Sequence, residues 1–104
     1  MTEAAALPVC ITLPVIAPQT DLMVGEVVTC DNGTWEGSNI LFSRQWRSGG
    51  FPIDFENNAD YVLSVNDTRE MVDCIVYARN VGGLTFAYAA PVGPIDARAK
   101  AVAP

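Results

Sequence analysis

The sequence contains no histidine, and this absence removes several kinds of chemistry at once. Without histidine there is no Ser-His-Asp or Cys-His catalysis, and the commonest metal ligand is missing. The three cysteines, Cys10, Cys30 and Cys74, are too widely spaced for a compact zinc site. Residues 54–60 gather oxygen ligands suited to calcium, but they lack the loop glycine of an EF-hand, and such polar turns are usually solvated. We therefore expect no enzyme activity, no metal site and no cofactor.

Basic residues are also scarce. The chain has 6 lysines and arginines against 12 aspartates and glutamates, a net charge of −6, and no basic run. Binding to nucleic acid depends on neutralising phosphates, so we expect no nucleic-acid partner. No stretch of about 18 apolar residues is free of charge or proline, so we expect no membrane span and no membrane partner. Glu3 stands where a signal peptide carries a basic residue, so no secretory signal is recognisable. Either a signal has been removed, or the protein is made in the cytosol and reaches an oxidising place by another route.

What remains is enough for one folded domain. Half of the 104 residues are hydrophobic (50%) and only 17% are charged, which is the composition of a chain that can bury a core. Both ends are rich in alanine and contain proline. We expect an N-terminal arm at residues 1–10, a domain at residues 11–95 and a C-terminal tail at residues 96–104.

Apolar and polar residues alternate along several short segments, which is the pattern of half-buried strands. The expected strands cover residues 11–16, 25–30, 40–47, 51–55, 59–65, 70–79 and 84–92. Segments rich in glycine and asparagine separate them, and residues 31–39 read as one such loop. No segment of useful length shows helical periodicity. About seven short strands at this spacing indicate an all-β chain, folded as an antiparallel β-sandwich.

Cys30, Trp46 and Cys74 follow one another in the order typical of an immunoglobulin-like sandwich. In the expected strands both cysteines face inward from different sheets, and the tryptophan packs against them. The two cysteines either form an intrachain disulfide or stay reduced in facing core positions, and the fold is the same in both cases. A disulfide that closes this loop stabilises a domain by about 4 kcal/mol on the chain-entropy model.

Two further features have more than one interpretation. Cys10 has no partner if the other cysteines pair, so it is either a small buried hydrophobe or a thiol reserved for another chain. Ile75, Tyr77, Phe86 and Tyr88 face outward from the last two expected strands. They are either ordinary cover of a sheet surface or, if contiguous, a protein interface.

Several short strings carry a family resemblance. The string Gly33-Thr34-Trp35-Glu36-Gly37 follows Cys30, a Gln45-Trp46 pair lies in the expected third strand, and Asp67 precedes Cys74 by seven residues. The turn Asn80-Val81-Gly82-Gly83 joins the last two strands. Together these strings, which span about residues 25–90, resemble the immunoglobulin-like repeats of bacteriophage structural proteins and bacterial surface proteins. The resemblance implies that Trp35 packs under its loop and joins Trp46 in the core.

The resemblance implies a non-enzymatic virion structural protein, and we expect a phage capsid decoration or cement protein. It would be made in the host cytoplasm, act on the particle exterior, and contact the major capsid protein or other virion proteins as a homo-oligomer or in many copies. Its termini would dock on the shell, and Cys10 would form an interchain disulfide once lysis releases the particle into oxidising surroundings. The alternative is a surface-displayed adhesion module that binds carbohydrate or a host surface through exposed Trp35 and Phe51.

Overall fold

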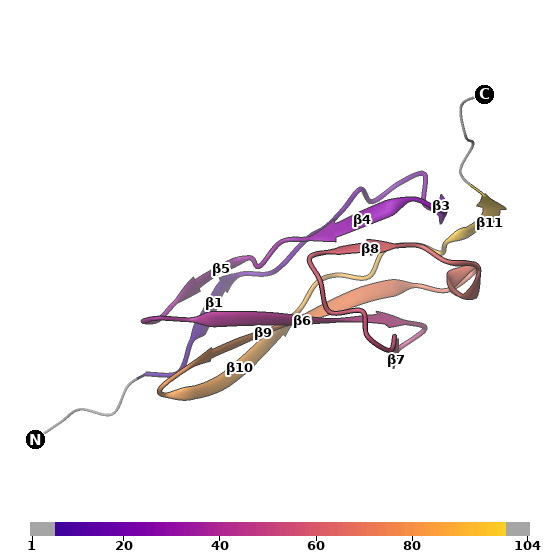
Figure 1. The fold of residues 1–104 in the computed structure, drawn as a ribbon. Coiled ribbons are helices and arrows are strands. Elements are labelled where there is room, and N and C mark those ends of the chain that lie inside the picture. The colour runs from indigo at the N-terminus through magenta and orange to yellow at the C-terminus, as the bar shows by residue number, and fades with distance from the viewer. Residues whose placement is uncertain (1–5, 100–104) are drawn as a thin grey trace, which may run out of the picture.

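The computed structural model describes residues 6–99, and its regular structure is β-strand apart from one short 3-10 helix (Figure 1). The strands are β1 (Val9–Thr12), β2 (Ile16–Ala17), β3 (Met23–Val24), β4 (Val27–Cys30), β5 (Thr34–Glu36), β6 (Leu41–Ser48), β7 (Phe51–Pro52), β8 (Asp60–Val62), β9 (Val72–Asn80), β10 (Gly83–Tyr88) and β11 (Asp96–Ala99). The helix, η1, covers Val65–Asp67. The all-β class expected from the alternating pattern is confirmed.

The strands form two layers of unequal length. One layer is a four-stranded antiparallel sheet in the order β10-β9-β6-β7. The other contains the antiparallel sheet β2-β4-β8, which the antiparallel pair β1-β5 prolongs toward one end of the molecule (Figure 1). At the opposite end β11 runs parallel to β3. The molecule is therefore elongated, with principal extents of 65 × 23 × 20 Å.

The core lies between these layers and centres on Trp46, which is fully buried. Its ring stacks on Tyr61 with 5.5 Å between centroids, and its indole nitrogen donates a hydrogen bond of 2.8 Å to the carbonyl oxygen of Asn58. Because that polar atom is satisfied, a large aromatic side chain can be buried at little cost. The other fully or nearly buried side chains around it include Ile16, Val28, Cys30, Leu63, Val72, Cys74, Val76 and Ile95.

A buried tyrosine and aspartate fix the turn that follows β8. Tyr61 donates from its hydroxyl to Asp67, at 2.5 Å, and the backbone nitrogen of Ser64 donates to the same carboxylate oxygen at 2.8 Å. Asp67 is only 1% exposed, so these bonds replace the water that the carboxylate loses. The contact closes η1 and directs the chain into β9. Burial, together with the hydrogen bond to Asp67, raises the pKa of Tyr61.

The segment at 31–39 differs from the loop that its composition predicts, because it contains β5. This strand exists through pairing with β1, in which Cys10 lies opposite Trp35 and Thr12 opposite Thr34. Gly33 allows the approach: its φ is +73°, and a Cβ there would lie 2.3 Å from the carbonyl oxygen of Thr12. Glycine adopts such a conformation without steric cost. The glycine and asparagine content that predicts a loop is a property of the local sequence, whereas β5 depends on pairing with β1, which is distant in sequence.

Several expected strands are shorter or divided. The strand at 11–16 is split into β1 and β2 around the buried Pro14, which cannot donate to a ladder. The strands at 51–55 and 59–65 shrink to β7 and β8, and Val65 enters η1 instead of continuing the face of Tyr61. The strand at 84–92 ends at Tyr88, although the chain beyond still bonds to the start of β9.

The proposed arm and tail also contain structure. Val9 and Cys10 belong to β1, and residues 96–99, assigned to the tail, form β11. A boundary based on alanine and proline content missed both strands because each is defined by its pairing with β5 or β3. Residues 1–5 and 100–104 lie outside the described part of the chain.

Replacing Trp46 by alanine should lower the free energy of unfolding by about 3–5 kcal/mol, because it leaves a cavity between the layers. Phe51→Ala is the matched control: Phe51 is 76% exposed, and we expect its loss to change stability by less than about 0.5 kcal/mol. Urea unfolding followed by circular dichroism measures both. Equal effects of the two substitutions would contradict the placement of Trp46.

Tyr61→Phe tests the buried hydrogen bond and its dependence on pH. Below about pH 10 the variant should be less stable by about 1.5–3 kcal/mol, since it loses a hydrogen bond to a charged group. The pKa of Tyr61 is raised in the folded state, so its contribution is complete below the unfolded value of about 10 and is lost as the pH rises further. The difference in free energy of unfolding between the natural protein and Tyr61→Phe should therefore decrease above about pH 10, by at most about 1.4 kcal/mol per pH unit.

Urea unfolding at a series of pH values measures this difference. Tyr77→Phe is the control, because it removes a tyrosine hydroxyl that makes no hydrogen bond within residues 6–99, so it should not lower the free energy of unfolding below pH 10 as Tyr61→Phe does. If the difference in free energy of unfolding between the natural protein and Tyr61→Phe stays constant above pH 10, the proposed role of the Tyr61–Asp67 hydrogen bond is contradicted.

Candidate functional site

The acidic residues considered for calcium do not form a cation site. Asp60 accepts a hydrogen bond of 2.8 Å from the hydroxyl of Thr29, while Asp54 faces solvent. Glu56 is half-buried, and its carbonyl oxygen accepts from the backbone nitrogen of Trp46. Within residues 6–99, no three cysteine, aspartate or glutamate side chains lie close enough together to hold a metal ion. The described residues also include no helix of the length and apolarity needed to cross a membrane.

Cys30 and Cys74 face each other across the core, one from β4 and the other from β9. Both are buried and both are free thiols in this structure. Their side chains interact directly, and this contact lowers the pKa of Cys30 and raises that of Cys74. The disulfide between them stays a prediction.

Arg44 is a charged residue on the same side of β6 as Trp46. Its side chain is half-buried, and Nε donates to the carbonyl oxygen of Cys30 at 3.2 Å, while a terminal nitrogen donates to Oδ1 of Asn32. The guanidinium therefore closes the core where the chain bends between β4 and β5. Its charge is a smaller cause of the lowered pKa of Cys30.

Cys10 and Trp35 lie opposite each other in the β1-β5 pair. The thiol of Cys10 is half-buried and donates to the carbonyl oxygen of Thr12 at 3.2 Å. Trp35 is also half-buried: its indole nitrogen donates to the carbonyl oxygen of Asn32 at 2.6 Å, and its ring meets the edge of Phe42 at 6.1 Å. Trp35 is thus packed against the molecule, whereas Phe51, the other aromatic residue considered for adhesion, is exposed.

The segment before β2 presents a row of exposed aliphatic side chains. Its members alternate along residues 7–15, are between 46% and 61% exposed, and together are called the N-terminal stripe: Leu7, Val9, Ile11, Leu13 and Val15. Pro8 and Pro14, between them, are buried. In the sequence these residues are apolar at every second position, but the assignment of residues 1–10 to an arm divided them between the arm and the domain. Contiguous exposed apolar residues of this kind mark interaction surfaces.

A second apolar surface covers the four-stranded sheet on the side away from the core. This outer face contains Leu41, Ile75, Tyr77, Leu84, Phe86 and Tyr88. The ring of Phe86 lies 6.2 Å from that of Tyr77 and 5.7 Å from that of Tyr88, so the three aromatic rings form one row across β9 and β10. A shallow hollow of about 350 Å³ opens beside it, lined by Leu41, Tyr77, Leu84 and their neighbours.

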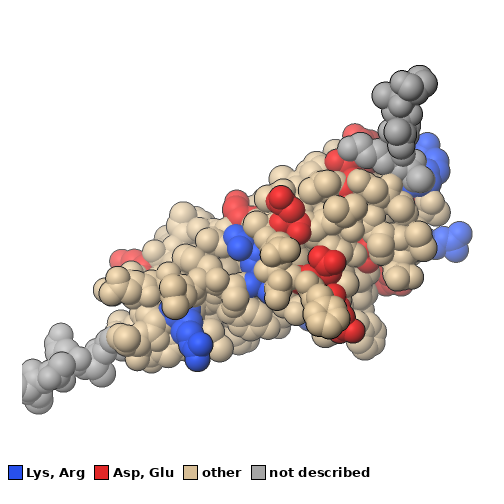
Figure 2. Space-filling view, in the orientation of Figure 1, with Lys and Arg blue, Asp and Glu red and all other residues tan. Residues whose placement is uncertain are grey.

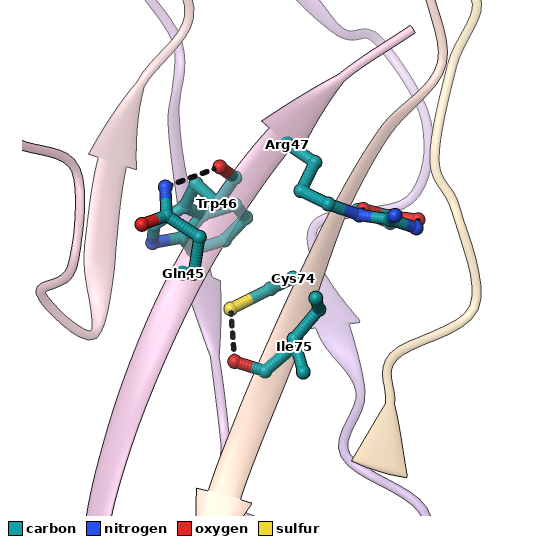
Figure 3. A network of polar contacts seen from close by, with 6 residues as sticks. Gln45, Trp46, Arg47, Cys74 and Ile75 are labelled. Carbon is teal, nitrogen blue, oxygen red and sulfur yellow. Dashed lines mark hydrogen bonds and ion pairs between the residues drawn. The ribbon is translucent and has the colours of Figure 1, made fainter. Parts of the chain in front are cut away.

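One ion pair lies on this face, which also carries the exposed Arg79 opposite Leu84. Arg47 donates to both carboxylate oxygens of Asp73, at 2.8 and 2.6 Å, and its guanidinium lies 4.9 Å from the ring centre of Tyr88. Figure 3 shows Arg47 on β6 reaching toward β9, with Gln45 on the same strand. The hydrogen bonds to Asp73 raise the pKa of Arg47. Sequence reasoning missed this pair because the two residues meet only through the register of β6 and β9.

Comparison of the chain with protein-family models, with curated proteins and with solved structures finds no match.

The facing thiols predict an oxidised form with a closed loop. After exposure to oxidant, the unfolded chain should show one free thiol, that of Cys10, and reduction should raise the number to three. Reduction should also lower the free energy of unfolding by about 4 kcal/mol. Thiol titration and urea unfolding, each with and without reductant, measure these changes.

Cys10→Ser serves as the control, because it should keep the stabilisation by oxidant, whereas Cys74→Ala should lose it. Three titratable thiols in the oxidised and unfolded natural protein would contradict the pairing.

Proposed function

We propose that this chain is an immunoglobulin-like β-sandwich that serves as a non-enzymatic structural protein on a bacteriophage particle, as a capsid decoration protein. The sandwich assignment is supported by the two layers and by Cys30, Trp46 and Cys74, which meet in the core between them. The particle assignment is supported by the resemblance in residues 25–90 and by the type of surface that the fold presents.

The N-terminal stripe carries the docking part of the proposal. Exposed aliphatic surface is unfavourable in water by roughly 25 cal/mol per Å², so a row of five such side chains gains from being covered. The row lies on β1 and the residues around it, near one end of an elongated body (Figure 1). Acidic side chains on the face drawn in Figure 2 lie mostly over the middle and toward the β11 end. A shell covering the stripe would therefore leave the more acidic part projecting outward.

Cys10 belongs to the same docking region, since it lies between Val9 and Ile11 of the stripe. Its thiol is only half-buried, at the position between two stripe residues where the side chain points away from the stripe. An interchain disulfide there would form after release into an oxidising medium and would lock subunits that the stripe has already positioned. Particles run on a gel without reductant would then show a band that reductant removes.

A second candidate function, adhesion to carbohydrate or a host surface, is favoured by one observation. Phe51 and Phe55, at 76% and 93% exposure, stand on the short segment after β6. The packed position of Trp35 weighs against it, because that ring is not displayed. Binding to a glycan array that is lost in Phe51→Ser and kept in Ile11→Lys would favour adhesion over shell docking.

The particle proposal is tested by adding the purified chain to phage particles stripped of their decoration proteins and measuring how much sediments with them. The natural chain should saturate the particles at a fixed copy number. Ile11→Lys, which places a charge in the centre of the N-terminal stripe, should reduce binding at least tenfold, since burying an unpaired charge is costly.

Val81→Lys is the matched control, because Val81 is 93% exposed in the turn between β9 and β10 and lies outside the stripe. Both variants should keep the circular dichroism of the natural chain. Failure of the natural chain to sediment with particles, or equal binding by Ile11→Lys, would contradict docking through the stripe.

A further inference from the structure

Within residues 6–99, strand β10 is an edge strand without the usual protection. Its sequence, Gly83–Tyr88, has no charge and no proline, and its register with β9 is unbroken over six residues. Natural edges are normally shortened, charged, bulged or covered, because an open edge can pair with another chain. The opposite edge of the same sheet, β7, has only two residues, of which one is Pro52. The edge β8 has three and begins with Asp60.

The pairing with β9 determines which backbone groups point outward. The nitrogen of Ala89 donates to the carbonyl oxygen of Cys74 at 2.9 Å, which sets the phase of the antiparallel ladder. Since hydrogen-bonded and non-hydrogen-bonded pairs alternate, residues 83, 85 and 87 bond toward β9. Leu84, Phe86 and Tyr88 therefore direct their N–H and C=O groups to the open edge.

The same three residues direct their side chains to the outer face, where they are 55%, 55% and 44% exposed. Among the described residues of the N-terminal segment, residues 6–12 do not cover this edge, because they pass beneath the inner side of β10. The hydroxyl of Thr85, on that inner side, donates to the carbonyl oxygen of Pro8 at 2.8 Å. Within residues 6–99, no backbone group is bonded to the outward edge of β10.

We infer that β10 pairs with β10 of a second copy of this chain, antiparallel and about a twofold axis at Phe86. In this register Phe86 lies opposite Phe86 of the second copy, and Leu84 lies opposite Tyr88. Every outward N–H and C=O group of the three residues is then bonded, and the two four-stranded sheets become one continuous sheet. A twofold axis brings the same patch of both copies together. Each copy's β10 edge is then occupied, so this contact cannot add a third copy.

Charge is compatible with a second copy only at an edge of this kind. The chain carries a net charge of −6, so two copies repel each other except where acidic side chains are absent or neutralised. Strand β10 is uncharged, Asp73 on the outer face is paired with Arg47, and the residue opposite Leu84 on β9 is the basic Arg79, so acidic repulsion is lowest along this edge. The three exposed side chains and the strand backbone bury less than about 1,200 Å² in total, which is the size of a reversible contact.

Sedimentation of the purified full chain tests this inference. Over a concentration series from roughly 1 to 500 µM, the natural chain should change from monomer to dimer, with a dissociation constant on the order of 10 µM. Phe86→Lys should weaken the dimer at least tenfold, because it removes two aromatic side chains from the contact and places two like charges opposite each other at the twofold axis.

Leu41→Lys distinguishes edge pairing from packing of two outer faces. Leu41 is 72% exposed on the same face but lies on β6, two strands from the edge, so the substitution should leave the dimer within about threefold of the natural constant. A mixture of Phe86→Lys with Phe86→Glu should restore dimers between the two variants, which a folding defect would not do.

A chain that stays monomeric at 500 µM would overturn the inference. So would a dimer that Phe86→Lys leaves intact, or one that Leu41→Lys disrupts as strongly as Phe86→Lys. The test uses no phage particle, so its outcome is independent of the particle proposal.

Discussion

Burial of Trp46 between the two layers is the contact on which most of the structure depends. Its ring holds Tyr61 in place, and Tyr61 in turn holds the carboxylate of Asp67 that fixes the turn into β9. β9 carries Cys74 to the position opposite Cys30. An aromatic ring, a buried acid and a pair of thiols are therefore coupled through one side chain, so a change at any of them acts on the alignment of both layers.

The local sequence pattern was sufficient to predict the strands that have one buried face. The alternation around Val28 and Cys30, and around Cys74 and Val76, indicated β4 and β9 with the correct sides inward. It was insufficient where a strand exists because of its partner. β5 contains Trp35 in a segment that reads as a turn, and it forms because β1 lies beside it and Gly33 allows the close approach. The β-strand propensity of a segment does not predict such contacts between distant residues.

The same division applies to the candidate site. Cysteine parity placed Cys30 and Cys74 together, and the outward positions of Tyr77, Phe86 and Tyr88 followed from counting along two strands. The ion pair that neutralises Asp73 could not be predicted, since it depends on the register of β6 against β9. Alanine and proline content predicted an arm at residues 1–10, although exposed apolar residues recur at every second position from Leu7 to Val15 and Val9 and Cys10 belong to β1.

The placement of β1 and β11 at opposite ends of the molecule bears on how it would respond to mechanical load (Figure 1). Tension applied along the chain would run parallel to the long axis and slide β1 against β5 and β11 against β3. Hydrogen bonds that lie across the direction of pull must break together, whereas those at the end of a hairpin break one after another. Forced unfolding is governed by the rate of that cooperative step. The β1-β5 and β11-β3 pairs would thus act as the two clamps through which the domain resists stretching.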